Sequence, residues 1–108
     1  MEDLELKKIS KDRLPSFWIV EEKDDRIEYI QGGGIGKITV KKGREDRPHY
    51  DPVIKVIVKY DDVESEVKHR SIKGANRQVL EVIKEIKECN RNNIKKFIRK
   101  NIKGFNNF

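Results

Sequence analysis

Gly32-Gly33-Gly34-Ile35-Gly36-Lys37 is the segment of this sequence whose residue types come nearest to a ligand-binding motif. Glycines let backbone N–H groups approach an anion, and the lysine could join them in holding a phosphate. A Walker loop, however, requires glycine, four residues and then Gly-Lys-Ser/Thr, whereas Gln31 stands at the first glycine position and Ile38 follows the lysine. The residues after Lys37 alternate as in a strand, not as in a helix. We therefore predict a structural bend or bulge here, with no nucleotide or other cofactor.

The two histidines and the single cysteine offer little further chemistry. His49 lies in the polar segment 43–51, which should be an exposed loop, and no nucleophile elsewhere is placed to use it as a general base. His69 should be a half-buried sheet residue, and Cys89, at the end of a predicted helix without a partner cysteine, should be inert. Their spacing matches no zinc site. The sequence therefore predicts neither a metal site nor an enzyme.

Positive charge is concentrated at the end of the chain. The net charge is +6, yet residues 1–88 balance, with 19 Lys and Arg against 19 Asp and Glu, and residues 89–108 carry no acid. A positive field confined to one segment attracts polyanions such as nucleic acid. We expect phosphate contacts from Arg91, Lys95, Lys96, Arg99, Lys100 and Lys103. We expect strand lysines to extend this surface, namely Lys37, Lys41, Lys55 and Lys59.

The elements that position these residues are organised around the stretch from Pro52 to Glu88. Residues 53–60 alternate as a strand, Asp61-Asp62 reverses the chain, and residues 63–71 form the return strand. From about Ala75 the apolar period becomes helical and continues to residue 88 or 89. This stretch therefore predicts a hairpin followed by a helix.

Weaker patterns flank this stretch. Residues 1–14 fit a short edge strand or a frayed helical turn, and we predict the strand. The apolar run in residues 16–22 predicts a buried strand, which a turn at Lys23-Asp24-Asp25 joins to a partner at residues 26–30. After residue 90, Asn92 or Asn93 should cap a second helix that Gly104 ends. The apolar side of this helix comprises Ile94, Phe97, Ile98 and Ile102.

These elements predict an α+β fold in one domain over residues 1–108: an antiparallel sheet of four to six strands followed by two C-terminal helices, the first packed on the sheet. Residues 1–72 should be mainly β, residues 73–90 a helix, and residues 92–103 the basic C-terminal helix. The strand order stays open. The predicted core is Phe17, Ile19, Ile27, Tyr29, Ile38, Val40, Ile54, Val56, Val58, Val79, Ile83 and Ile86, with Trp18 left undecided.

A sheet of three strands followed by a helix resembles the order of elements in double-stranded-RNA-binding domains and in the arm-binding domains of phage-type integrases. The lysine pair at the helix start of the RNA-binding type is missing here, so no family is assigned. We expect a small non-catalytic accessory protein that binds DNA or RNA. The alternative is a protein-interaction module, a homodimer or an inhibitor of a larger enzyme, that docks through Ile94, Phe97, Ile98, Phe105 and Phe108.

The sequence also predicts a compartment. A single cysteine cannot form an internal disulfide, and no apolar signal region follows Met1. No stretch approaches membrane-spanning length. We therefore expect a cytoplasmic protein with no membrane partner.

Overall fold

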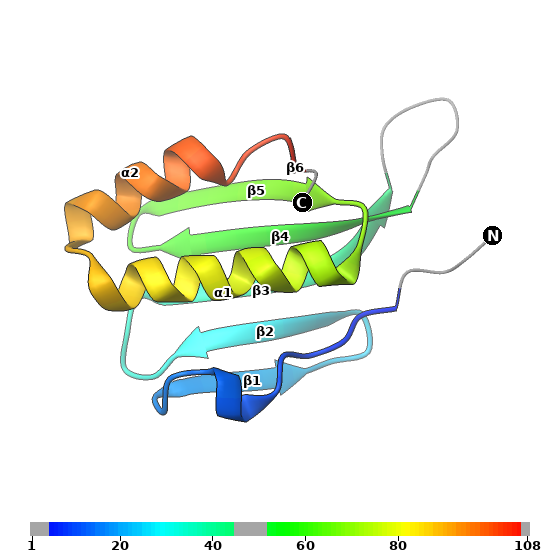
Figure 1. Cartoon of the computed structure of the whole chain (residues 1–108), viewed down its shortest axis with the longest axis horizontal. Coiled ribbons are helices and arrows are strands. Elements are labelled where there is room, and N and C mark those ends of the chain that lie inside the picture. Colours follow the sequence, from blue (N-terminus) through cyan, green and yellow to red (C-terminus); the bar gives the residue numbers. More distant parts are fainter. Residues whose placement is uncertain (1–4, 45–51, 107–108) are drawn as a thin grey trace.

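Five strands follow one another along the chain and pair in that order in the computed structural model, which describes residues 5–44 and 52–106 (Figure 1). They are β1 (Trp18–Glu22), β2 (Arg26–Gln31), β3 (Gly36–Arg44), β4 (Pro52–Tyr60) and β5 (Val63–His69). Every pairing between them is antiparallel, and β6 (Phe105–Asn106) then joins β5 in parallel. The predicted α+β fold is confirmed, and the strand order is that of a meander.

Along the chain, two helices follow β5 and precede β6. α1 (Ile72–Glu88) begins three residues before Ala75, because the Ser71 Oγ accepts a hydrogen bond from the Gly74 N–H at 3.0 Å. α2 (Arg91–Asn101) is capped by Asn90, not by Asn92 or Asn93 as predicted. Gly104 lies beyond the end of α2 with φ of +60°, a left-handed conformation that suits glycine where the chain turns into β6.

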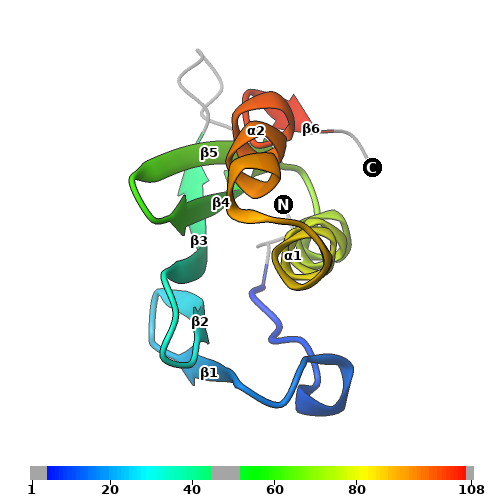
Figure 2. The same ribbon diagram turned by 90° about the vertical axis from the view of Figure 1, so that its left-hand side faces the viewer.

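All of the described helical elements lie on one side of the sheet. Figure 2 shows α1, α2 and the N-terminal segment, including a 3₁₀ turn at Lys11–Arg13, opposite one sheet face. We call the other side of the sheet the open face. By strand alternation and register it carries Phe17, Ile19, Glu21, Arg26, Glu28, Ile30, Lys37, Thr39, Lys41, Lys55, Ile57, Lys59, Glu64, Glu66 and Lys68.

The core fills the space between the sheet and the helices. Ten predicted core residues are buried there: Ile27, Tyr29, Ile38, Val40, Ile54, Val56, Val58, Val79, Ile83 and Ile86. The prediction for Phe17 and Ile19 is wrong, because both side chains are 53% exposed, whereas Trp18 is 2% exposed. Successive side chains of a strand point to opposite sides, so burying Trp18 places both neighbours on the open face.

The N-terminal segment is not the predicted edge strand, as far as residues 5–14 show. It crosses the helix side of the sheet, where the Ile9 N–H donates to the Tyr29 hydroxyl at 3.0 Å. The Asn76 Nδ2 donates to the Lys7 carbonyl at 2.8 Å, which ties the segment to α1. The segment thus covers β1 and β2, beside α1 (Figure 2). The predicted loop 43–51 begins later, since β3 runs to Arg44, and His49 lies outside the described residues.

Candidate nucleic-acid interface

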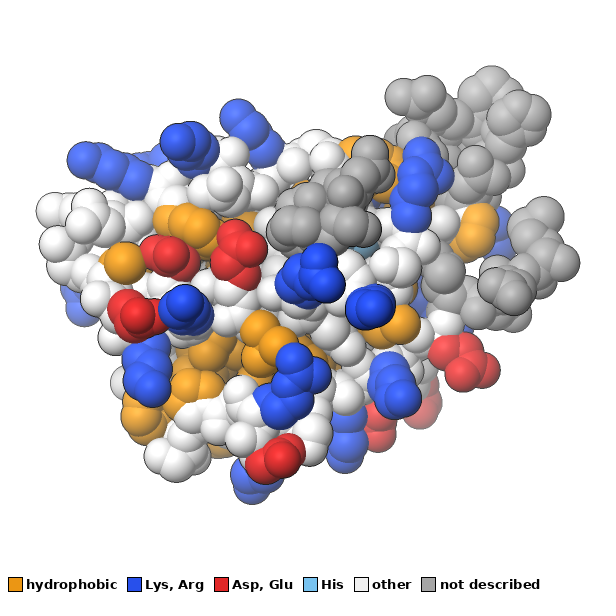
Figure 3. All heavy atoms as spheres, in the orientation of Figure 1, with side chains coloured by type: hydrophobic (Ala, Val, Ile, Leu, Met, Phe, Trp, Pro, Cys, Tyr) orange, Lys and Arg blue, Asp and Glu red, His pale blue; other side chains and the backbone are white. Residues whose placement is uncertain are grey.

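α2 presents a basic surface to solvent. Ile94, Ile98 and Ile102 bury one side of the helix in the core. Lys96, Arg99 and Lys100 lie on the exposed part of the helix surface, Arg91 is exposed as its first residue, and Lys103 is exposed just beyond its end. We call these five residues the basic arc: Arg91, Lys96, Arg99, Lys100 and Lys103. Within the described part of the chain, no carboxylate forms an ion pair with these five side chains. Figure 3 shows blue side chains along the edge of the molecule that α2 forms.

Lys95 has a different environment from the basic arc. Its side chain is 18% exposed, and its Nζ lies 2.8 Å from the Asp62 Oδ1 and 3.0 Å from the Asp61 Oδ2. The carboxylate of Asp62, followed by that of Asp61, raises the pKa of Lys95, and Lys95 in turn lowers the pKa of Asp62. Lys95 therefore joins the start of α2 to the β4–β5 turn, and its charge is already compensated within the fold.

The apolar side of α2 is used inside the domain. Ile94 and Ile98 are buried, and Phe97 is half-buried against the core. Phe105 is half-buried, with the Arg70 guanidinium 4.5 Å above its ring centre. Phe108 lies outside the described residues. Docking of a partner through Ile94 and Ile98 would therefore require α2 to leave the sheet.

The strand lysines do not lie beside the basic arc. Lys37, Lys41, Lys55 and Lys59 all point to the open face, whereas α2 packs with α1 on the other side of the sheet. β5 carries Glu64 and Glu66 on the open face, between these lysines and the sheet edge where α2 lies. The structure thus separates the two groups of basic residues that we expected to form one surface.

Sequence reasoning missed Lys68, which lies directly opposite Lys55 on the open face. Lys55 in turn pairs with Lys41, so three lysines stand side by side on β3, β4 and β5. The signal was available, because the two-residue turn at Asp61-Asp62 fixes the register of β4 and β5.

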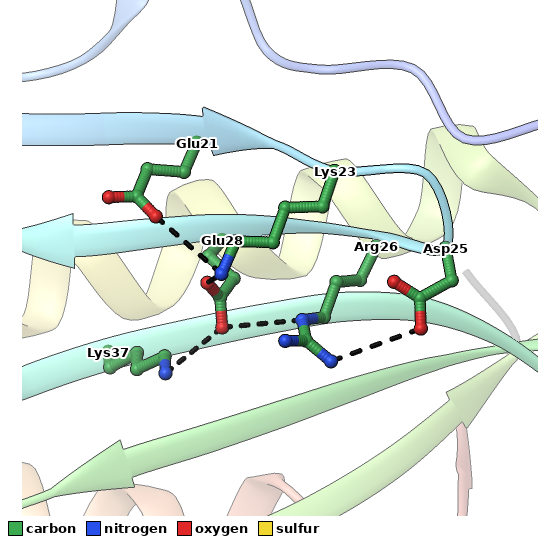
Figure 4. A network of polar contacts seen from close by, with 6 residues as sticks. All are labelled: Glu21, Lys23, Asp25, Arg26, Glu28 and Lys37. Atoms are coloured by element: carbon green, nitrogen blue, oxygen red, sulfur yellow. Dashed lines mark ion pairs between the residues drawn. The ribbon is translucent and has the colours of Figure 1, made fainter.

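Lys37 belongs to a compact ion-pair cluster around Glu28 (Figure 4). The carboxylate of Glu28, with a side chain 5% exposed, lies 2.9 Å from the Lys23 Nζ, 3.0 Å from the Lys37 Nζ and 3.6 Å from the Arg26 Nε. Hydrogen bonds from Lys23 and then Lys37 lower the pKa of Glu28. With Glu21 and Asp25, the cluster contains three cations and three anions, so Lys37 contributes no excess charge.

The glycine segment closes the β2–β3 hairpin. Gly33 has φ of +63°, and the Gly32 N–H donates to the Phe17 carbonyl at 2.6 Å. The Gly36 N–H donates to the Gln31 Oε1 at 3.1 Å. These amide groups therefore serve the fold, and β3 begins at Gly36 as the alternation predicts.

His69 and Cys89 also make contacts within the fold. His69 is 1% exposed, more buried than predicted, and its Nε2 hydrogen-bonds the Gln78 Oε1 between β5 and α1. Burial lowers the pKa of His69, which favours the neutral ring. The Cys89 Sγ donates to the Glu85 Oε2 at 3.0 Å, and this contact raises the pKa of the thiol and disfavours the reactive thiolate.

Comparisons with known proteins identify no relative: no family model matches the chain, and no curated protein or solved structure matches it. Among residues 5–44 and 52–106, no helix is both long and apolar enough to cross a membrane. In the same part of the chain, no three side chains of His, Cys, Asp or Glu are grouped so that they could hold a metal ion.

Proposed function

We propose that this protein is a small non-catalytic nucleic-acid-binding accessory protein, and that the basic arc of α2 contacts phosphate groups. The observation that supports this most is that, within the described residues, no carboxylate forms an ion pair with the basic arc. The exposed side of α1, in contrast, mixes Lys84 and Lys87 with Glu88. A solvated helix face normally mixes both signs in this way.

The basic arc is also held in a fixed position, which favours binding. The buried apolar side orients α2, and Lys95 in its second turn ties the helix to Asp61 and Asp62. From Arg91 to Lys100 the helix rises about 14 Å. A duplex carries about one negative charge per 1.7 Å of its axis, so several phosphates lie within this length. Such contacts position a protein on nucleic acid without reading bases.

A variant with Lys96, Arg99 and Lys100 changed to Gln tests this proposal, because Gln keeps helix propensity while removing three charges. Lys95 stays unchanged since it is ion-paired within the fold. Fluorescence anisotropy with a short labelled duplex should show weaker binding, with the slope of log K against log salt reduced by up to about 2.7. The thermal midpoint should stay the same.

The matched control removes three charges from α1, through Lys73, Lys84 and Lys87 changed to Gln, all of which are exposed. It should bind the duplex nearly as well as wild type. Absence of duplex binding by wild type at low salt, or equal losses in both variants, would show that the basic arc is not a specific contact surface.

A protein-interaction module is the second candidate function. The exposure of Phe17 and Ile19 favours it, because these apolar side chains lie on the open face and not on α2. Light scattering over a range of protein concentrations would reveal self-association through this surface.

A further inference from the structure

One end of the open face carries an exposed apolar group that the basic arc does not explain. Phe17, Ile19 and Ile35 are the exposed large hydrophobic side chains of the described residues. Ile19 pairs with Ile30, which is half-buried. Ile35 continues the β3 ladder, since its carbonyl accepts from the Asp61 N–H at 3.1 Å, and by alternation it shares the open face with Lys37. We call Phe17, Ile19, Ile30 and Ile35 the apolar platform.

Gly32 packs directly against the backbone of Phe17. It follows the last residue of β2, and its N–H donates to the Phe17 carbonyl at 2.6 Å. A Cβ atom at Gly32 would lie 2.6 Å from the Phe17 carbonyl oxygen, so a larger residue does not fit without a backbone shift. The side chain of Phe17 itself is 53% exposed and therefore accessible to a ligand.

The other end of the open face carries the lysine row, which is Lys41, Lys55 and Lys68. These residues are direct neighbours on three adjacent strands, and strands lie about 4.8 Å apart. Like charges directly opposite each other destabilise a sheet. Within the described residues no carboxylate forms an ion pair with any of them, in contrast to Lys37 in the Glu28 cluster.

Gly43 helps to place the middle lysine of the row. A Cβ atom at Gly43 would lie 2.6 Å from the Lys55 Cε and 2.9 Å from its Cδ. The aliphatic part of Lys55 thus lies over the glycine, which leaves its ammonium group at the surface. The lysine row is therefore an uncompensated positive cluster with half-buried stems.

The distance between the platform and the row suits an extended chain. Ile35 and Lys41 are six residues apart on one strand, which corresponds to about 20 Å. Lys59 and the half-buried Ile57 lie between them on β4. Single-strand-binding faces that combine base stacking with phosphate contacts cover roughly four or more nucleotides.

We propose that the open face is a separate site for single-stranded nucleic acid, with bases on the apolar platform and phosphates on the lysine row. The charge of the row complements a polyanion, and the platform complements the apolar faces of unstacked bases, which a duplex hides. Glu64 and Glu66 separate this site from the edge of the sheet where α2 lies. The inference shares with the proposed function that the ligand is nucleic acid, but it does not depend on the basic arc.

The test compares oligo-dT, which forms no duplex, with a blunt duplex, both labelled and measured by fluorescence anisotropy. A platform variant changes Phe17 to Ser and Ile19 to Thr, two exposed positions where the fold should tolerate polar residues. It should lose about tenfold in affinity for oligo-dT, since stacking of even one base is lost, and bind the duplex as wild type does. A row variant with Lys41, Lys55 and Lys68 changed to Gln should lower the salt slope for oligo-dT by about 2.

Each outcome separates the two proposals. The open-face site is supported if the platform and row variants lose oligo-dT binding while the variant with Lys96, Arg99 and Lys100 changed to Gln keeps it. This holds even if the basic arc proves inactive. Duplex binding that depends on the basic arc, without oligo-dT binding, overturns the open-face site and leaves the proposed function standing. Concentration-dependent dimers that the platform variant abolishes, with oligo-dT binding unchanged, would show instead that the platform docks a second copy.

Discussion

Glu28→Gln should destabilise the protein, because it removes the charge at the centre of the Glu28 cluster. The carboxylate is 5% exposed, whereas the side chains of Lys23, Lys37 and Arg26 are 43%, 46% and 38% exposed. These three partners keep access to water, so solvent screening reduces the contribution of each pair. Hydrogen bonds to a charged group contribute roughly 1.5–3 kcal/mol each when well shielded. We expect a loss of about 1–3 kcal/mol in the free energy of unfolding at neutral pH.

The effect should depend on pH in a known direction. Lys23 and Lys37 lower the pKa of Glu28 from its ordinary value of 4.5, so the unfolded chain takes up this proton at a higher pH than the folded chain. The stabilisation is therefore fully present above pH 4.5 and is lost as pH falls through the lower folded pKa. The difference between wild type and Glu28→Gln should shrink in that acid range.

Urea unfolding followed by the fluorescence of Trp18, the single tryptophan, would measure this difference at neutral and acid pH. Glu21→Gln is the matched control, since Glu21 contacts Lys23 at 3.8 Å but is 48% exposed. Its stability should stay near wild type at every pH. The role assigned to the cluster would be refuted if wild type and Glu28→Gln had the same free energy of unfolding at neutral pH. It would also be refuted if their difference stayed the same in acid.

Three further substitutions test the packing by urea or thermal unfolding. Trp18→Ala should cost about 3–5 kcal/mol and Ile19→Ala less than about 0.5 kcal/mol, because the first side chain is buried and the second is exposed; comparable losses would contradict the strand orientation. Val56→Ala and Ile83→Ala should each cost about 2–4 kcal/mol, and a loss below about 0.5 kcal/mol at both would mean that the core lies elsewhere. Gly32→Ala should cost about 1–3 kcal/mol, since its Cβ would lie 2.6 Å from a backbone oxygen, and an unchanged midpoint would show that the hairpin relaxes freely.

The sequence was sufficient to predict the buried side of an element wherever its apolar residues followed a clear strand or helix period. Residues 53–60 alternate cleanly, and Asp61-Asp62 leaves one register for the hairpin, so the buried side of β4 was correct. Helical spacing likewise identified the buried sides of α1 and α2. Their starts were misplaced because Ser71 and Asn90 cap earlier than the apolar pattern begins.

The first hairpin shows why a regular pattern is needed. Residues 17–20 are all apolar, so the pattern does not show which of them face the core. Only the length of the turn that follows could decide this. A three-residue turn at Lys23-Asp24-Asp25 would place Phe17 and Ile19 in the core. The structure has a two-residue turn instead, in which the Lys23 N–H donates to the Arg26 carbonyl at 2.8 Å. That shift of one residue reverses both faces of β1.

The candidate site was only partly accessible from sequence, since charge composition identified the basic arc but not its surroundings. Whether Lys95 or Lys37 is free depends on Asp61, Asp62 and Glu28, which become neighbours only after folding. Whether α2 lies on the same side of the sheet as the strand lysines also depends on which side the helices pack against. No periodicity in the sequence encodes that placement.

The meander has a consequence for the order in which the chain folds and opens. Each long strand pairs with its neighbour in sequence, so these contacts close short loops at small entropic cost and should form early. The Asn76–Lys7 hydrogen bond joins residues 69 apart, and the pairing of β6 with β5 closes a loop that contains both helices. We expect these two closures to open first in local unfolding, so that the amides of Ile9 and Lys68 exchange with solvent well before that of Val56. The protein can then loosen at both ends while its central strands stay paired.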